Sequence, residues 1–134
     1  MANFAAVIAK FGENTKEALV DVYRGSIIDL SASIIMTTPV DKGHLRNNWF
    51  LSMNTTTFQT TDDPDKSGAS TIERAKGAIA KLGYKDSVYL VNNLVYSVPI
   101  EYDAWSKKAP SGMVRINTAR WDTIVDANVR RVLK

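Results

Sequence analysis

The pattern of hydrophobic and polar positions predicts one long helix near the start of the chain. From Asn14 to about Thr37, apolar residues return at three- and four-residue steps, which is the period of one helix face. Asn14 can cap this helix, and Glu17 three residues later completes a capping box. Ile28 and Ile35 widen the apolar face, so the helix either covers a broad core or also meets another subunit. The main face consists of Leu19, Val22, Tyr23, Ser26, Ile27, Leu30 and Ile34.

Two further helices follow from the same period. The first opens at Ser70 with the capping-box sequence Ser-Thr-Ile-Glu, and it ends at Gly83, a residue type that commonly terminates helices. The second covers residues 118–133, with Asn117 as its cap. Residues 1–12 are read as a short helix or as an arm that reaches a neighbouring subunit, because chain ends are ordered only when something holds them.

Strands are predicted where the period falls to two. Apolar and polar residues alternate over residues 45–53 with two interruptions, and residues 57–59 can extend this strand. Residues 86–92 contain a continuous apolar run, which is typical of a central strand covered on both faces. Residues 94–98 alternate again, and we expect them to form a hairpin with that strand, ended by Pro99.

Together these elements predict an α+β fold for a single domain that covers residues 1–134. The long N-terminal helix and the C-terminal helix are expected to pack on a small mixed or antiparallel sheet, with a shorter helix inserted between its strands. A chain of this length can bury a modest core. The residues expected in that core are Leu30, Trp49, Leu51, Leu90 and Trp121.

Composition excludes several classes of function. The chain has no cysteine, which excludes a disulfide framework and thiolate chemistry and fits a cytosolic setting. No apolar run approaches the roughly 18 residues that span a bilayer, so we expect no membrane partner. The first residues lack a basic segment, and a secretory signal is therefore not expected.

The net charge of +3 is too small to indicate nucleic-acid binding by itself. The charge is unevenly distributed, because residues 105–134 hold seven basic and two acidic residues, a balance of +5. One interpretation is a solvated helix whose basic residues lie near its C-terminus, where they suit the helix dipole. The other is a surface that meets an acidic ring of partner proteins or passing DNA.

Candidate catalytic and metal-binding residues are few. His44 is the only histidine, and one histidine cannot build a multi-histidine metal site. The aspartates at positions 62, 63 and 65 lack the glycine and the bidentate glutamate of a calcium loop, so an exposed turn is expected. Glu101 is expected to pair with Arg46 or Arg115 rather than to act as an acid or base. We therefore expect no enzyme, no metal and no cofactor.

Two stretches carry a resemblance to a known family. The first is TPVDKGHLRNNW at residues 38–49, and the second is NNLVYSVPIEYDAWSKKAPSGM at residues 92–113. In this order and spacing they resemble neck or tail-completion proteins of long-tailed bacteriophages, including the minor tail protein Z type. With the flanking helices, the resemblance covers most of the chain. The sequence departs from the family at Asp103-Ala104-Trp105, where a glycine would be expected. The matching residues are Thr38, Pro39, Val40, Asp41, Gly43, Leu45, Arg46, Asn48, Trp49, Asn92, Asn93, Leu94, Tyr96, Glu101, Tyr102, Ala109, Pro110, Gly112, Met113, Val114 and Arg115.

This resemblance implies a structural protein of the virion neck, which joins the head connector to the tail as a ring around the DNA channel. The ring would be a homo-oligomer of sixfold or twelvefold symmetry, assembled in the host bacterial cytoplasm. Its partners would be head connector or adaptor proteins on one side and tail terminator or tail tube proteins on the other. DNA would pass through the lumen without sequence-specific contacts. The residues expected at partner interfaces are Trp105, Lys107, Lys108, Arg115, Arg130 and Arg131.

Two alternatives stay open at this point. Trp105, beside Lys107 and Lys108, either anchors a protein interface, as aromatic residues often do, or folds back over the core. The basic C-terminal third either serves a ring interface or makes the chain a nucleic-acid-binding protein. The second reading predicts binding to free duplex that weakens steeply as salt rises.

Overall fold

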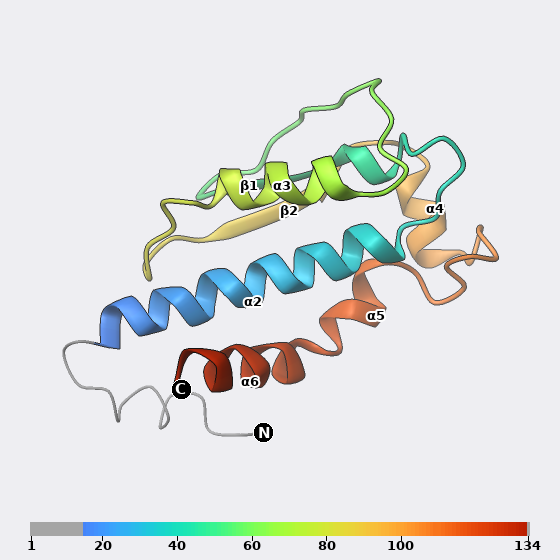
Figure 1. Ribbon diagram of the computed structural model, residues 1–134. Coiled ribbons are helices and arrows are strands. Elements are labelled where there is room, and N and C mark those ends of the chain that lie inside the picture. The colour runs from blue at the N-terminus through green and yellow to red at the C-terminus, as the bar shows by residue number, and fades with distance from the viewer. Residues whose placement is uncertain (1–14, 134) are drawn as a thin grey trace.

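The computed structural model describes residues 15–133, and its elements confirm the α+β class (Figure 1). The predicted arm at residues 1–12 and the predicted cap Asn14 lie outside the described residues. In chain order the elements are α2 (Thr15–Thr37), the 3₁₀ helix η2 (Arg46–Asn48), β1 (Trp49–Met53), α3 (Ala69–Ala78), β2 (Val88–Asn92), α4 (Ser97–Tyr102), α5 (Val114–Thr118) and α6 (Trp121–Val132).

Helix α2 is the central element of the fold. It lies between the sheet and α3 on one side and α5 and α6 on the other (Figure 1). Its side chains enter three clusters: Ile34 packs with Trp49, Ile27 packs with Leu51, and Val22 packs against α6. No helix within residues 15–133 has the length and apolar character needed to cross a bilayer.

The predicted core residues fall into two groups. Trp49 and Leu51 are buried, as predicted. Leu30, Leu90 and Trp121 are half-buried and pack at the margins of the clusters. The wide apolar face of α2 is explained inside the subunit, because Ile35 is fully buried and Ile28 packs on the second cluster.

The sheet in the described residues has two antiparallel strands, with Trp49 opposite Asn92 and Met53 opposite Val88. The predicted hairpin over residues 94–98 is wrong, because α4 begins at Ser97. Pro99 fits this helix because it stands in the first turn, where a backbone N–H has no helical partner. The strand β2 is therefore not central, and its Tyr89 is 44% exposed.

The first strand is shorter than its alternation predicts. Residues 46–48 form η2 instead, and residues 57–59 are not a strand. Thr57 and Gln59 accept hydrogen bonds through their carbonyls from the side chain of Asn93. This segment is therefore an irregular loop that lies beside the end of β2. The side chain of Asn93 holds it there, in place of the backbone hydrogen bonds of paired strands.

Helix α3 begins one residue before Ser70, and no capping box forms there. The carboxylate of Asp65 takes that place, accepting hydrogen bonds from the amides of Gly68 and Thr71 and from the Thr71 hydroxyl. A carboxylate at this position also suits the positive end of the helix dipole. The helix ends at Ala78, before the predicted terminator Gly83.

The predicted C-terminal helix at residues 118–133 corresponds to α6, which begins at Trp121, and the short helix α5, which was not predicted, precedes it across a turn at residues 119–120. Asn117 does not cap a helix. It is buried, and its side-chain amide donates to the Thr37 hydroxyl and to the carbonyl of Met113.

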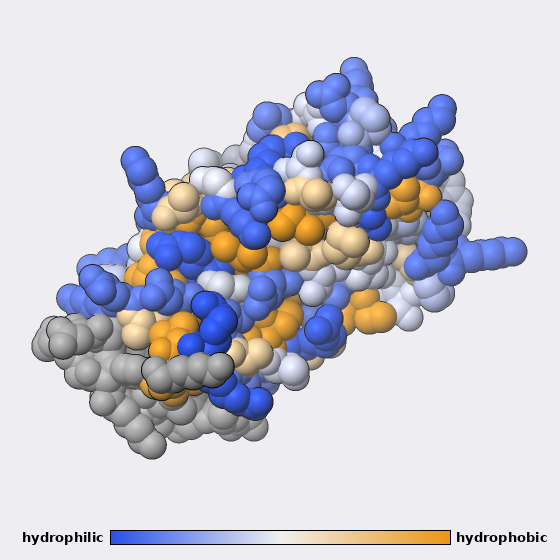
Figure 2. Space-filling view, viewed as in Figure 1, coloured by the Kyte–Doolittle hydropathy of each residue, from blue (hydrophilic) through white to orange (hydrophobic). Residues whose placement is uncertain are grey.

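On the face drawn in Figure 2, hydrophobic side chains form a band along α2 and α3, and hydrophilic ones cover most of the remainder.

Candidate functional site

The first family-like stretch forms a buried polar cluster, which we call the polar clamp: Arg46, Asn47 and Asn48 of η2. Asn48 is fully buried, and its side chain both donates to and accepts from the backbone of Thr61, at 2.9 and 3.0 Å. Asn47 donates to the carbonyl of Asp63 at 2.9 Å. The clamp thereby holds a loop that has no regular backbone pairing of its own.

Arg46 joins the end of α2 to the same loop. Its guanidinium donates to the carbonyl of Lys66 at 2.6 Å and to the carbonyls of Met36 and Thr38 at 3.0 and 2.9 Å. Burial lowers the pKa of Arg46, and the negative charge of Asp65 opposes that shift. Arg46 is thus a structural donor to three carbonyls, with its charge balanced nearby.

Helix α3 completes the clamp through Arg74. This guanidinium donates to the backbone carbonyls of Asn47 and Trp49 at 2.7 and 2.8 Å. It also lies over the ring of Phe50, 4.1 Å from the ring centre, within the range of a cation–π contact. The Trp49 indole N–H donates to the Thr38 hydroxyl at 2.8 Å, so each end of the stretch is tied to the other.

The geometry of the first stretch requires a glycine at position 43. Its φ of +89° is the left-handed region, and a Cβ there would lie 2.6 Å from the backbone of Asp65. The Gly43 carbonyl accepts the amides of Asn47 and Asp65. Any other residue would strain the turn and separate it from the loop.

In the second stretch, the buried carboxylate of Glu101 accepts hydrogen bonds from the backbone at the start of α5. It accepts the amides of Met113, Val114 and Arg115 at 2.7, 2.7 and 3.0 Å, and the Arg115 guanidinium at 3.0 Å. Burial alone would raise the pKa of Glu101, but these hydrogen bonds outweigh it and lower the pKa. The predicted ion pair of Glu101 is therefore confirmed with Arg115, whereas Arg46 serves the clamp.

Gly112 is required for this arrangement. Its φ is +87°, and a Cβ would lie 2.6 Å from the carbonyl oxygen of Glu101. Arg115 makes two further contacts, a hydrogen bond to that carbonyl and a stacking contact at 4.8 Å from the ring centre of Tyr102. Arg115 is thus held on one side of α4.

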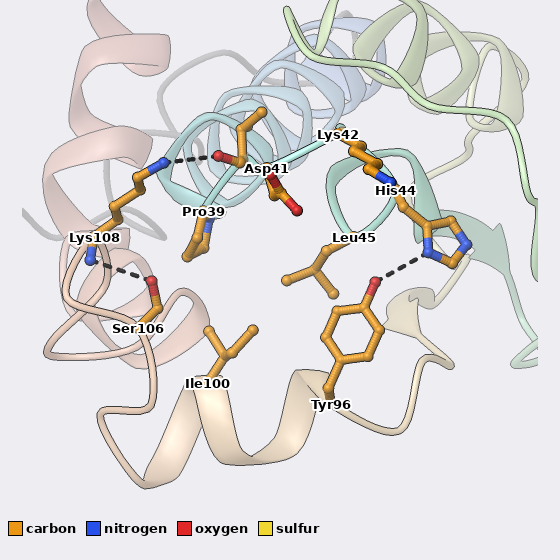
Figure 3. A pocket seen from close by; sticks show the side chains of 11 residues that line it. Pro39, Asp41, Lys42, His44, Leu45, Tyr96, Ile100, Ser106 and Lys108 are labelled. Carbon is orange, nitrogen blue, oxygen red and sulfur yellow. Dashed lines mark hydrogen bonds between the residues drawn. The ribbon is translucent and has the colours of Figure 1, made fainter.

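A hollow of about 410 Å³ lies between the two stretches (Figure 3). Tyr96 and Ile100 of the α4 region point into it from one side, and the turn at residues 39–45 closes the other. The Tyr96 hydroxyl lies 3.0 Å from His44 Nδ1. His44 Nε2 lies 2.9 Å from the carbonyl of Thr61, which can only accept, so Nε2 carries the proton and Nδ1 accepts from Tyr96.

The His44–Tyr96 pair therefore has its polar atoms occupied by each other and by the backbone. Lys108 also reaches across the hollow, donating to the carbonyl of Val40 at 2.8 Å. Glu101 is not among the lining residues, so it does not converge with His44. Within residues 15–133, no group of three or more histidine, aspartate or glutamate side chains is placed to hold a metal ion.

The other side of α4 presents an apolar surface, which we call the α4 surface: Val95, Val98, Tyr102 and Trp105. Their exposed fractions are 90%, 59%, 65% and 66%. Two residues along a helix correspond to about 200° of rotation, so Val98 and Tyr102 point away from the hollow that Tyr96 and Ile100 face. Trp105 is exposed and does not fold back over the core.

The predicted contact residues do not form one site. Trp105, Lys107 and Lys108 follow α4, and Arg115 stacks on it, so these four share one end of the molecule. Arg130 and Arg131 lie in the last turn of α6, toward the opposite end (Figure 1). Arg131 also donates to the side chain of Asn128 at 2.8 Å. The C-terminal charge balance is therefore not one continuous basic patch.

Val95 and Val98 are missed as surface residues because the alternation predicts a strand over residues 94–98. The sequence holds a signal for a helix surface here, since Val98 and Tyr102 are spaced i and i+4, the spacing of neighbours on one helix face. Trp105 lies beyond the end of α4 at Tyr102 and after the left-handed Ala104, so it is not on that face. The polar clamp carried no such signal. Arg, Asn and Asn in a row are ordinary surface residues until a loop is placed against them.

No protein family model matches the chain, and no curated protein or solved structure matches it either. The function proposed below depends on the two family-like stretches and on the geometry around them.

Proposed function

We propose that this chain is a structural protein of a bacteriophage neck, a ring component that joins the head connector to the tail. The observation that carries the proposal is the α4 surface. It carries exposed valine, tyrosine and tryptophan side chains, and Lys107 and Lys108 follow its Trp105 in the chain. Apolar and aromatic anchors with a charged rim are typical of surfaces that bind other proteins.

The role of the two family-like stretches supports the same proposal. Their polar side chains hold a loop, a turn and a helix start in fixed positions. A ring repeats one contact between identical subunits, so each subunit must present its surface in the same geometry. Side chains that fix that geometry would serve such an assembly.

In this proposal the chain is non-catalytic and forms a ring of six or twelve copies around the DNA channel. Connector or adaptor proteins lie on one side, and tail terminator or tail tube proteins lie on the other. The protein is carried in the virion after assembly in the host cytoplasm. Trp105, Lys107 and Lys108 are the residues assigned to the contact with the adjoining ring.

Head–tail joining in a phage that lacks its own copy of this protein tests the assignment. A variant with Trp105→Ala, Lys107→Ala and Lys108→Ala should leave separate filled heads and tails in electron micrographs. A matched variant with Phe58→Ala, Lys81→Ala and Lys85→Ala also removes one exposed aromatic residue and two exposed lysines. That control should restore particles. Normal particle yield from the first variant would contradict the proposal.

The alternative, a nucleic-acid-binding protein that uses the basic C-terminal third, has less structural support. Arg115 is occupied by Glu101, Lys108 by a backbone carbonyl, and Arg130 and Arg131 lie at the other end of the molecule. A gel shift of the purified protein with free duplex at two salt concentrations distinguishes the two functions. Binding that falls steeply with salt would favour the alternative.

A further inference from the structure

The strand β2 has one edge along which its backbone is unpaired. The amide of Asn54 donates to the carbonyl of Ser87 at 2.8 Å, and these two residues continue the antiparallel register of β1 and β2. Hydrogen-bonded and non-bonded pairs alternate along such a ladder, so the backbone groups of Val88 and Leu90 point away from β1. Within residues 15–133, these outward N–H and C=O groups have no hydrogen-bond partner. We call these groups the β2 edge.

The corresponding edge of β1 is covered by α3 (Figure 1). Arg74 of α3 donates to the outward carbonyl of Trp49 at 2.8 Å and lies over the ring of Phe50. Ala75 of the same helix packs with Leu51, on the other face of the strand. Covering an edge in this way prevents further strands from pairing with it.

The β2 edge lacks this protection. Among the described elements, only β1 lies along β2. Charged side chains and prolines commonly protect an exposed edge from pairing, but the strand reads VYLVN and contains neither. The edge therefore remains open to pairing with another extended chain.

An apolar groove of about 560 Å³ lies beside the β2 edge. Its lining includes Val88 and Leu90 of β2, Val114 and Trp121 of the α5–α6 region, and the middle of α2. None of its described lining residues carries a charge, and none belongs to the α4 surface. The volume falls within the roughly 300–1,000 Å³ of pockets that bind ligands. Unpaired backbone and an uncharged groove thus occur together.

We propose that the β2 edge and this groove bind an extended segment of a partner protein, which adds to β2 as a third strand. Main-chain hydrogen bonds give such strand addition its affinity, and pockets for alternate side chains give it specificity. Side chains on the inner face of the added strand would enter the groove and must be apolar. Those on its outer face would lie beside Tyr89, which is 44% exposed, and can be polar. The segment therefore alternates apolar and polar residues.

The unpaired backbone determines the class of partner. A helix or a lipid chain could fill the groove, but it would cover the outward groups of Val88 and Leu90 without pairing them. Covered backbone groups that lack a partner destabilise a complex. An extended chain about 4.8 Å from β2 supplies both donors and acceptors along the edge.

The surroundings of the edge favour a free tail or loop over the β2 edge of a second copy. Val114 and Trp121 line the same groove as Val88 and Leu90, so every copy carries its α5–α6 region beside its own edge. Two copies that paired through these edges would each bring that region into the space required by the other. A bare extended segment brings no such helices.

Hydrogen exchange of single amides in the full chain, followed by NMR, tests the edge first. In the free protein, the amides of Val88 and Leu90 should exchange roughly tenfold faster than those of Tyr89 and Val91, which point toward β1. Slow exchange of the first pair would overturn the proposal, because the edge would already be covered. Sedimentation at rising concentration would then show whether a second copy or another segment of the same chain covers it.

Binding is tested with a synthetic peptide of alternating valine and threonine that has a lysine at each end. This peptide should slow exchange at Val88 and Leu90 and leave Tyr89 and Val91 unchanged. A peptide that protects neither amide at about 1 mM would overturn the proposal. Binding without this protection would also overturn it, since the groove would then bind side chains alone.

Two methylated peptides separate backbone pairing from side-chain contact. One carries N-methyl groups on the valines and the other on the threonines, and these two sets of amides point to opposite edges of a strand. One of the two peptides should lose binding, and the other should keep it. Equal binding by both, or loss by both, would contradict strand addition.

A substitution in the protein gives a second measurement. Val88→Pro removes one outward N–H, and proline is tolerated at the first residue of an edge strand. Val88→Ala is the matched control, because it also removes the valine side chain but keeps the N–H. Peptide affinity, measured by calorimetry, should fall roughly tenfold further for the proline variant. Equal affinities would contradict the proposal.

Circular dichroism checks that both variants are folded. If Val88→Pro does not fold, the methylated peptides with the unaltered protein still decide the outcome. All of these measurements use purified protein, and the proposed site contains none of the residues assigned to the neck contact. The result is therefore independent of the neck assignment.

Discussion

In the polar clamp, Arg46, Asn47 and Asn48 are each less than a tenth exposed, whereas Val98 and Trp105 of the α4 surface are more than half exposed. Both regions belong to family-like stretches of the sequence. In the first, charged and amide side chains are inside the protein and in contact with backbone. In the second, apolar side chains face solvent although the hollow next to them is lined by Ile100.

The difference indicates what each region does. Buried polar groups destabilise a protein unless each finds a partner, so a buried polar set that is largely hydrogen-bonded fixes one geometry. Exposed apolar groups contribute little to folding but contribute to binding once a partner covers them. The clamp therefore determines the shape of the subunit, and the α4 surface determines what the subunit contacts. Substitutions in the two regions should separate stability from assembly.

The largest effect is expected from Trp49→Ala. Trp49 packs in the first core cluster and donates to the Thr38 hydroxyl. Its removal leaves a cavity and takes one of two hydrogen bonds from that hydroxyl, which still donates to the Ile34 carbonyl. The free energy of unfolding, measured in urea, should fall by about 3–5 kcal/mol. A loss of less than about 1 kcal/mol would mean that the indole is not part of the core.

The next largest effect is expected from Asn48→Leu, which keeps the volume and removes the hydrogen bonds. The Thr61 amide and the His44 carbonyl would lose their partner, and the Thr61 carbonyl would keep only His44 Nε2. The loss of stability should be about 2–4 kcal/mol, because buried polar groups would stay unpaired. Hydrogen exchange should speed up first in residues 55–68. Uniform acceleration across the chain would contradict a local role for the clamp.

A smaller and pH-dependent effect is expected from Glu101→Gln, at about 1.5–3 kcal/mol near neutral pH. The folded-state pKa of Glu101 is lowered, so its carboxylate stabilises the fold above the ordinary value of about 4.3. That contribution is lost as pH falls through the lowered pKa. Asp65 also has a lowered pKa, because the bonds from Thr71, Gly68 and Ser67 outweigh its burial.

The measurement is the midpoint of urea unfolding between pH 7 and pH 2.5. Wild-type stability should decrease as pH falls below about 4. The Glu101→Gln variant should lose less over the same range, because one of the carboxylates with a lowered pKa is absent. Parallel pH profiles for the two proteins would show that Glu101 does not stabilise the start of α5.

The smallest effect on stability is expected from Trp105→Ala, within about 0.5 kcal/mol, since exposed side chains add little to folding. Head–tail joining or oligomer formation should nevertheless decrease. Comparison with Trp49→Ala sharpens the contrast between the regions, since the two substitutions remove the same side chain. A stability loss above about 1 kcal/mol at Trp105 would move it from the surface to the core.

Sequence reasoning predicted the parts of the fold in which local pattern and tertiary packing agree. The helical period of α2 and the burial of Trp49 and Leu51 were predicted and found. An ion pair of Glu101 with Arg46 or Arg115 was also predicted, and the structure has it with Arg115. It failed over residues 94–98, where five residues of alternation suit both an exposed strand and an irregular entry to a helix. Short patterns of this kind do not separate the two.

By itself, the sequence determined the α+β class, the long helix and the location of the two stretches, because periodicity and glycine positions act locally. Only the tertiary structure decided that Arg46, Asn47 and Asn48 are buried and that Val98 and Tyr102 are exposed. The physical reason is that a polar side chain can be buried wherever a distant backbone segment supplies its hydrogen bonds. Arg46 also bonds to Met36 and Thr38 nearby, but the partners at residues 61–66 lie thirteen to twenty positions further along the chain, beyond the reach of any local pattern.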